Sequence, residues 1–499
     1  MDDQVQPPQQ PTVTRRTVLA AAAAGGAGVA AIRLLGAGAP AARGPVPITG
    51  GQANAQGLDW VSPLEAEPAK VAHLLRRTSF GYTQAELDQG IRDGYARTVD
   101  RLVETKPAEP PAFPGGDTAT QLPGQQLKTN ELQLWWLDWM LATPTPLAER
   151  LTLFWHSHFT SDIRKVGAQS PFMYWQNLTW RKQALGDRRD MLYQVTIDPA
   201  MLRYLDLGNS DARNPNENYA RELMELFTMG AGTFTEDDVK SASKALAGWR
   251  EPRTEAMLEA ARQEAMQRQR TIPPQLANAK ADTARVGVFE RNRAHQGGLA
   301  FLGQTRQWDT QSVIDRILEQ DVTALRIATK LAVQFVSPTP SDAYTARLAD
   351  RFRRSKYSVK ELMRAILTSP EFTEPTAYRS LIKSPIEYML SAAKALGNTA
   401  LTRLVSSSGG SMGMTLFDPP SVGGWPNNES WVSSNAMLAR ANYITAAVQQ
   451  TRRLPPTARA HEVHLDSVLS GQTLKLLNEA NDEKRRWTYL LAAPEFQLK

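Results

Sequence analysis

The chain of 499 residues contains no cysteine at all. Disulfide bonds therefore cannot stabilise it, and neither a thiolate nucleophile nor a thiolate metal ligand is available. Any metal would have to be held by His, Asp, Glu or other oxygen ligands. The missing disulfide framework leaves packing of the 42% hydrophobic residues to hold the fold.

Several sequence signatures of common enzymes are also missing. The chain has no Walker loop, no dinucleotide fingerprint followed by an acidic residue, no HExxH and no G-x-S-x-G elbow. These absences argue against a nucleotide cofactor and against the commonest zinc-protease and esterase plans. The net charge of +6 is mild and scattered, so no nucleic-acid-binding stripe is expected.

The N-terminus has the pattern of an export signal. A polar lead is followed by the pair Arg15 and Arg16, then by a soft Ala/Gly-rich run from Val18 to Ile32. That run is too short and too weakly apolar for a membrane span, which needs about 20 apolar residues. The pattern resembles a twin-arginine signal, so we expect export by the twin-arginine translocase to the periplasm or beyond, with no stable membrane span after processing. Of two candidate cleavage sites, after residue 41 and after residue 55, the second is favoured because domain-like sequence starts soon after it.

The remainder of the chain is predicted to be mainly α-helical, with two lobes and very little β structure. Helical periodicity dominates, and "RVGVFERN" is the only short strand candidate. Thr83 and Glu86 have the spacing of a capping box, and Pro144 and Pro146 are expected to separate two helices. Residues 251–285 form a Gln/Arg/Ala-rich segment that we interpret as a solvated helical insertion. The predicted divisions are thus the signal and lead at 1–55, an N-terminal lobe at 64–250, the insertion, and a C-terminal lobe at 286–499.

The stretch "NPNENYARELMELFTMG" carries the densest group of candidate site residues. On one helix, Asn218, Glu222 and Glu225 share a polar stripe beside the apolar face, and Glu217 precedes Arg221 by four residues, the spacing of an ion pair. The stripe suits either a cleft wall or a solvated surface face. Asn216 lies just before it.

Two histidines and two tryptophans complete the candidates. His158, in "FWHSHF", is placed on an apolar helix face, and His156 is about 160° away from it on the same helix. An inward histidine is either a hydrogen-bonded core residue or a proton-transfer group. His295 precedes Gly297-Gly298 in a loop, while Trp425 and Trp431 lie in a Pro/Gly-rich loop that suits either sugar stacking or a plugged structural turn.

These motifs together resemble the bacterial family catalogued as domain of unknown function 1800. The resemblance covers residues 64 to 499 and rests most on "NENYARE" and "PPSVGGW". The family pattern matches Asn216, Glu217, Asn218, Arg221, Glu222 and His158. Its usual His-Asp is replaced here by His295-Gln296, which weakens a metal site in this chain, and a later lysine is replaced by Ala300. The resemblance implies a largely helical, exported protein of open activity, whose gene neighbours belong to the sulfatase-like domain of unknown function 1501.

Two functional hypotheses follow. In the first, the protein is an envelope or extracellular enzyme with acid/base or metal-assisted hydrolytic chemistry. Its cleft would hold Glu217, Glu222, Glu225, Arg221, His158 and His295, with Asn216, Asn218, Trp425 and Trp431 contacting substrate. In the second, it is a non-catalytic scaffold or partner of a sulfatase-like protein, and the Glu/Arg/Asn helix is a buried structural network. The metal, if any, is not identified by the sequence.

Overall fold

A computed structural model describes residues 61–499 except 115, 117–127, 168–170 and 269. The predicted export signal, including Arg15 and Arg16, lies outside the described residues. Within them the regular structure is almost entirely helical, and the only sheets are two antiparallel pairs, β1 with β2 and β3 with β4. The mainly α prediction is confirmed. None of the described helices is both long and apolar enough to cross a bilayer.

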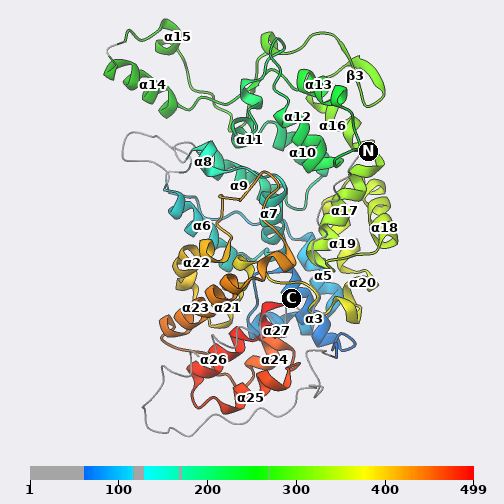
Figure 1. Cartoon of the computed structure of the whole chain (residues 1–499), viewed down its shortest axis with the longest axis vertical. Helices are drawn as coiled ribbons and strands as arrows, with labels where there is room; N and C mark the ends of the chain where they lie inside the picture. The colour runs from blue at the N-terminus through cyan, green and yellow to red at the C-terminus, as the bar shows by residue number, and fades with distance from the viewer. Residues whose placement is uncertain (1–60, 115, 117–127, 168–170, 269) are drawn as a thin grey trace, which may run out of the picture.

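The chain runs along an elongated body and then returns, so that its first and last described helices lie in the same part of the molecule (Figure 1). The first part holds α3 (Glu67–Thr78), α4 (Gln84–Asp93), α5 (Tyr95–Glu104), α6 (Thr129–Ala142), α7 (Pro146–His158), α8 (Ile163–Val166) and α9 (Phe172–Lys182). The next holds α10 (Arg188–Thr196), α11 (Pro199–Tyr204), α12 (Asn218–Glu222), the π-helix η2 (Leu223–Thr228) and α13 (Glu236–Ala245). Then come α16 (Thr310–Leu318), α17 (Asp321–Phe335), α18 (Asp342–Arg354), α19 (Val359–Leu367) and α20 (Pro370–Thr373). The last part holds α21 (Pro385–Ala395), α22 (Thr402–Gly409), α23 (Ser434–Gln450), α24 (Ala460–Leu465), α25 (Gly471–Glu479), α26 (Glu483–Ala492) and α27 (Pro494–Gln497).

The local signals in the sequence explain many of these boundaries. Thr83 and Glu86 form a complete capping box at the start of α4, which satisfies backbone N–H groups that the first turn leaves free. Pro146 occupies the first turn of α7, where a missing N–H costs nothing. The predicted break between α6 and α7 is therefore confirmed.

The predicted insertion is an arm that projects from the body (Figure 1). It consists of α14 (Glu255–Gln267) and α15 (Pro274–Ala277), and only Ala256 and Leu258 of these two helices are buried. Its base is the sheet of β1 (Trp249–Arg250) and β2 (Val288–Phe289). The strand candidate at "RVGVFERN" therefore does contain a strand.

One hairpin was not expected from the sequence. Strands β3 (Gly298–Phe301) and β4 (Gln304–Gln307) pair around a tight turn at Leu302 and Gly303, which have φ values of 44° and 80°. Positive φ at both turn residues is the geometry that joins two strands by a two-residue loop. All four residues of β4 are exposed, so the alternation that identifies a half-buried strand is missing from the sequence.

The protein has two main hydrophobic cores, and each contains residues from both sides of the insertion in the sequence. The first takes residues from Leu74 to Phe372, and the second takes residues from Phe80 to Leu498. Both α7 and α9 contribute to each core, since Trp155 and Trp180 pack in the first while Leu153 and Trp175 pack in the second. The lobes predicted at 64–250 and 286–499 are thus interleaved in space, with α7 between the two cores.

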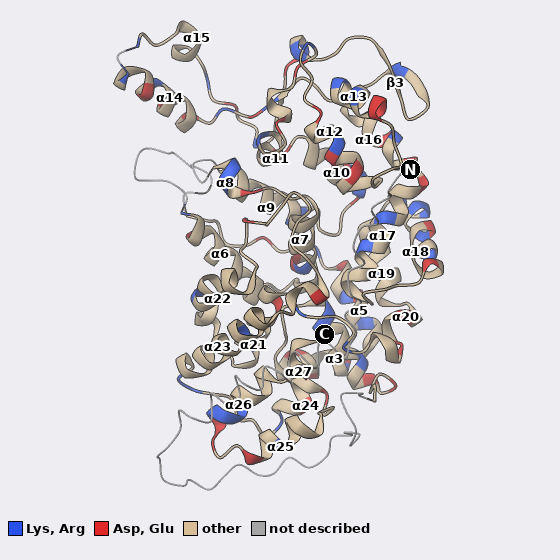
Figure 2. Cartoon of the chain, viewed as in Figure 1, with Lys and Arg blue, Asp and Glu red and all other residues tan. Residues whose placement is uncertain are grey.

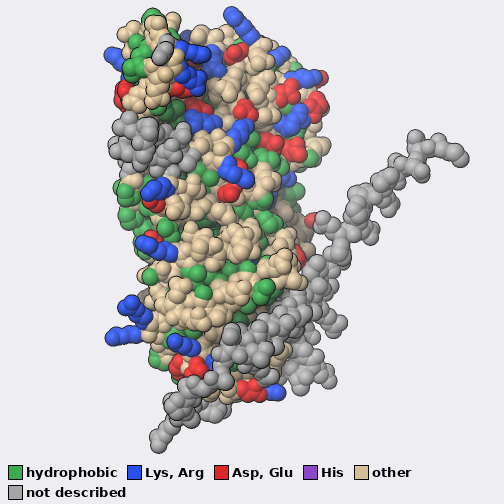
Figure 3. All heavy atoms as spheres, turned by 60° about the vertical axis from the view of Figure 1, so that its left-hand side comes forward, with side chains coloured by type: hydrophobic (Ala, Val, Ile, Leu, Met, Phe, Trp, Pro, Cys, Tyr) green, Lys and Arg blue, Asp and Glu red, His purple; other side chains and the backbone are tan. Residues whose placement is uncertain are grey.

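Charges of both signs are spread over the whole chain (Figure 2). On the face shown in Figure 3, Lys and Arg side chains lie interspersed with Asp and Glu. That face carries no broad area of a single sign, in keeping with the scattered charge of the sequence.

Candidate functional site

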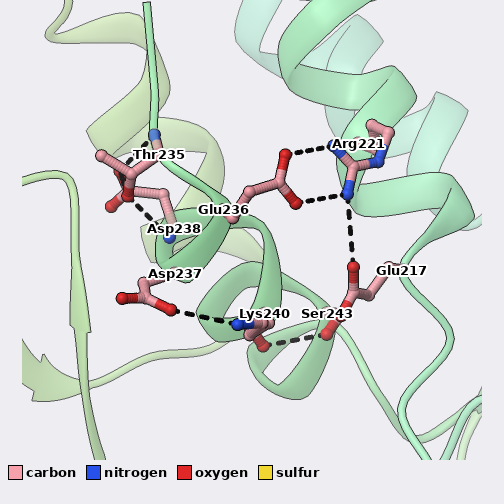
Figure 4. Close-up of polar contacts among 8 residues, drawn as sticks. All are labelled: Glu217, Arg221, Thr235, Glu236, Asp237, Asp238, Lys240 and Ser243. Carbon is pink, nitrogen blue, oxygen red and sulfur yellow. Dashed lines mark hydrogen bonds and ion pairs between the residues drawn. The ribbon is translucent and has the colours of Figure 1, made fainter.

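The ion pair predicted between Glu217 and Arg221 is present at the surface. An Arg221 Nη lies 3.3 Å from Glu217, and both Arg221 Nη atoms donate to Glu236 on α13 at 2.8 and 2.7 Å (Figure 4). The three side chains are 34%, 39% and 66% exposed in the order Arg221, Glu217, Glu236. The network joins α12 to α13 in solvent, so it is not the buried network of the second hypothesis, and exposed pairs of this kind contribute under about 1 kcal/mol.

The other polar residues of this segment serve different neighbours. The Asn216 side chain accepts from the Asn218 backbone at 2.9 Å, and the Asn218 amide donates to Asp206 at 3.3 Å. Burial and the nearby Glu225 carboxylate raise the pKa of Glu222 above its usual range. Glu225 in turn acts electrostatically on Arg326 of α17. Asn218 and Glu225 of the predicted stripe therefore have different neighbours, while Glu222 and Glu225 stay close enough to repel each other.

His295 lies in the loop after η3 (Arg291–Arg293). This loop runs beside the start of the candidate segment, since the Ala212 backbone donates to the Arg293 carbonyl at 2.8 Å. Among the described residues no hydrogen bond or ion pair joins His295 to Glu217, Glu222 or Glu225.

Among the predicted residues, His158 is buried and has polar contacts at both ring nitrogens. It is the last residue of α7 and is 5% exposed. Its Nε2 lies 3.1 Å from the Phe227 carbonyl, and its Nδ1 lies 3.1 Å from the Nζ of Lys330 on α17. Arg188 Nη2 also lies 3.0 Å from Nε2. In the tautomer in which Nδ1 accepts from Lys330, Nε2 carries the ring proton and donates to the Phe227 carbonyl.

The Phe227 carbonyl is freed by the π-helix. Helix η2 ends at Thr228, and the last carbonyls of a helix have no partner within it. Arg188 of α10 donates to the Phe227 oxygen at 2.7 Å and shares it with His158. The negative end of the helix thus attracts cationic and N–H groups from α7 and α10.

Two cations lie beside His158, and no carboxylate is among the groups that shift their pKa values. Arg188 is fully buried, and burial lowers its pKa, although a guanidinium remains charged in proteins. Burial, with Arg326 and Arg188 nearby, lowers the pKa of Lys330 to about 8. Burial, Lys330 and Arg188 together lower the pKa of His158 well below its usual range, so the imidazole is neutral.

A cavity of about 180 Å³ opens on this cluster. His158 and Lys330 line it, together with Arg150, Trp425 and Trp431. The remaining lining residues are Leu153, Phe154, Ser157, Thr329, Val333, Gln334, Ser384, Met414, Gly423, Pro426 and Asn427. The structure thus brings three of the predicted residues together, and it adds Lys330, Arg150 and Asn427.

The tryptophan loop closes the cavity from one side. Trp425 and Trp431 are only 5% and 4% exposed, so their rings belong to the core, as expected for a plugged structural loop. The Trp425 backbone donates to the Ser157 hydroxyl at 3.1 Å, which fixes the loop on the end of α7. The same contact places the Trp425 side chain beside the His158 site.

A family model described as "Protein of unknown function (DUF1800)" matches residues 73–498. The chain belongs to the DUF1800 family. A search of curated proteins and a search of solved structures gave no match. The whole cavity of this DUF1800 protein lies within the matched residues.

The other histidines of the DUF1800 chain have structural surroundings. His156 points away from His158 and lies 3.0 Å from Asn177, as the helical spacing predicts. His73 lies 3.1 Å from the Phe372 carbonyl in a buried position. His461 is buried too. The described residues contain no group of three or more His, Asp or Glu that could hold a metal ion.

Proposed function

We propose that this DUF1800 protein is an exported enzyme that performs acid/base chemistry in the cavity at His158 and Lys330. The supporting observation is the 3.1 Å contact between Lys330 Nζ and His158 Nδ1 at the cavity wall. The proposal keeps His158 from the predicted set and assigns the proton-transfer role of the glutamates to Lys330.

The pair is suited to proton transfer near neutral pH. With a pKa of about 8, Lys330 is neutral in roughly a tenth of the molecules at pH 7. A neutral amine can take a proton from water as the water attacks a substrate, and the ammonium can return it to the leaving group. His158 holds the amine, and its own orientation is fixed by the Phe227 carbonyl.

Lys330 should react as a neutral amine at unusually low pH. We expect its rate of acetylation by acetic anhydride, followed by peptide mass spectrometry, to rise with a midpoint near pH 8. Lys475, whose side chain is 73% exposed, is the internal reference on the same molecule. A midpoint near pH 10 for Lys330 would contradict the acid/base role.

Activity provides the second part of this test. In a screen of chromogenic esters and glycosides, Lys330→Met and His158→Asn should each lower kcat on any substrate found by about 10²-fold or more. Lys475→Met should leave kcat unchanged, and variants that unfold can be recognised by circular dichroism.

Export is part of the same proposal and rests on the pair Arg15 and Arg16. Replacing both residues by lysine should retain the protein inside the cell, because the twin-arginine route depends on that pair. Fractionation and immunoblotting measure the exported share, which should fall to background. A double variant exported as well as the unchanged chain would remove this part of the proposal.

The docking role in the second hypothesis has less support. A tryptophan loop that binds a sulfatase-like partner needs accessible rings, and both rings here are almost fully buried. The observations at the cavity favour the enzyme.

A further inference from the structure

We infer that the cavity at His158 and Lys330 takes a small molecule that carries an oxyanion, namely a carboxylate, a sulfate ester or a phosphate ester. This inference rests on the proposed function and names the substrate class of the same site. Three independent features support it: the balance of charge, an unpaired donor and the size of the cavity.

The charges that face the cavity are cationic. Lys330 and Arg150 line it, and none of the lining residues given above is Asp or Glu. Arg150 is paired with Glu387, a carboxylate that it shares with Lys499. No carboxylate of the described residues forms an ion pair with Lys330.

The protein groups around Lys330 do not neutralise its positive charge. Its neighbours are neutral His158 on α7, Arg188 on α10 and Arg326 on α17. The nearest acidic influence, Glu225 on η2, acts on Arg326. Buried or half-buried cations are normally paired, and a bound anion would complete this set.

Trp425, which lines the cavity, also carries an unpaired donor. The indole Nε1 of Trp425 is buried and has no hydrogen-bond partner among the described residues. Tryptophan can only donate through this atom, and leaving a buried donor unpaired is unfavourable. An oxyanion offers the acceptors that the surrounding protein does not supply.

The volume limits the molecule to about one ring. A cavity of 150 Å³ holds benzene, so 180 Å³ suits a single ring with one charged group. Phe154, Trp425 and Trp431 supply aromatic surface beside the polar end. A sugar acid or a sugar sulfate has this combination of an apolar ring face, hydroxyl groups and one oxyanion.

A bound oxyanion also couples binding to the charge of Lys330, because it favours the ammonium form. Binding should then weaken as the pH rises and Lys330 loses its proton.

The test compares sodium glucuronate, glucose 6-sulfate, inorganic sulfate and neutral glucose at constant ionic strength. Thermal unfolding and calorimetry should show that the two sugar anions bind and raise Tm, while glucose does not. Between pH 7 and pH 9.5 the affinity of the sugar anions should fall by roughly tenfold, the equivalent of one lost ion pair.

Variants identify the site. Lys330→Met should weaken binding of the sugar anions by roughly tenfold, and Trp425→Phe, which keeps the ring and removes only the N–H, should weaken it as well. Lys475→Met is the matched control and should bind normally. Equal effects of glucose and glucuronate, or unchanged binding in both Lys330→Met and Trp425→Phe, would overturn the inference; binding of inorganic sulfate alone would do so too.

The outcome separates this inference from the proposed function. Sugar-anion binding that depends on Lys330, together with an acetylation midpoint near pH 10, would keep the oxyanion site and reject acid/base catalysis by Lys330. A midpoint near pH 8 without any response to the anions would reject the oxyanion site and keep the reactive lysine.

Discussion

Replacing Gly424 by alanine is expected to destabilise the protein by about 3–4 kcal/mol and to open the cavity. Gly424 has a φ of 88°, and a Cβ placed on it would lie 2.1 Å from the Ser157 carbonyl oxygen. Backbone atoms at that distance must move, and the loop that carries Trp425 would move with them. Urea unfolding measures the loss of stability, and the binding assay for sugar anions measures the damage to the cavity.

Gly232→Ala is the matched control for this change. Gly232 also has a positive φ, 78°, but a Cβ on it would meet nothing within 4 Å. Only the conformational cost of about 1–2 kcal/mol should then appear. Equal losses in the two variants would show that the contact with Ser157 is not what constrains the loop.

Glu387→Ala is expected to lower the free energy of unfolding by about 3–5 kcal/mol, because it leaves buried cations without a partner. Glu387 is 4% exposed and contacts both Arg150 and Lys499. Burial lowers the pKa of Lys499 to about 7. Arg150 stays charged at every pH considered, so Arg150 is the permanent partner of Glu387. Glu462→Ala, which removes a 43% exposed carboxylate paired with Arg459, should cost under about 1 kcal/mol.

The same carboxylate predicts a dependence on pH. Burial opposes its ionisation, but Arg150 and Lys499 outweigh burial and lower the pKa of Glu387 from 4.5 to about 2. A lowered folded-state pKa adds stability that is complete above about pH 4.5 and is lost as the pH falls through 2, about 3 kcal/mol in total. Unfolding measured at pH 6 and pH 3 should show about 2 kcal/mol of this loss in the unchanged chain, and Glu387→Ala should lack that part. The same loss of unfolding free energy between pH 6 and pH 3 in both proteins would refute this prediction.

Local features of the sequence predicted local features of the structure. The ion pair of Glu217 with Arg221 follows from a spacing of four residues on one helix, and the capping box at Thr83 follows from a spacing of three. Such pairs need no knowledge of the fold. The family resemblance added the right fold class, but no contacts between distant residues.

The cavity could not be predicted in the same way. Lys330 is 172 residues from His158 in the sequence, and nothing in the regular helix around it marks it as functional. The candidate helix also changes from α to π geometry after Glu222. A π turn holds an additional residue, so positions beyond Glu222 are rotated from where a period of 3.6 places them. Asn218 and Glu225, predicted on one stripe, have different neighbours, Asp206 and Arg326.

The interleaving of the two cores also limits when the chain can fold during its synthesis. Helix α3 is made early, yet its Arg76 pairs with Asp466, which follows it by 390 residues. Neither main core is complete until most of the chain has left the ribosome, since one extends to Phe372 and the other to Leu498. Unfinished apolar surface therefore stays uncovered for most of translation, the condition under which nascent chains need chaperones.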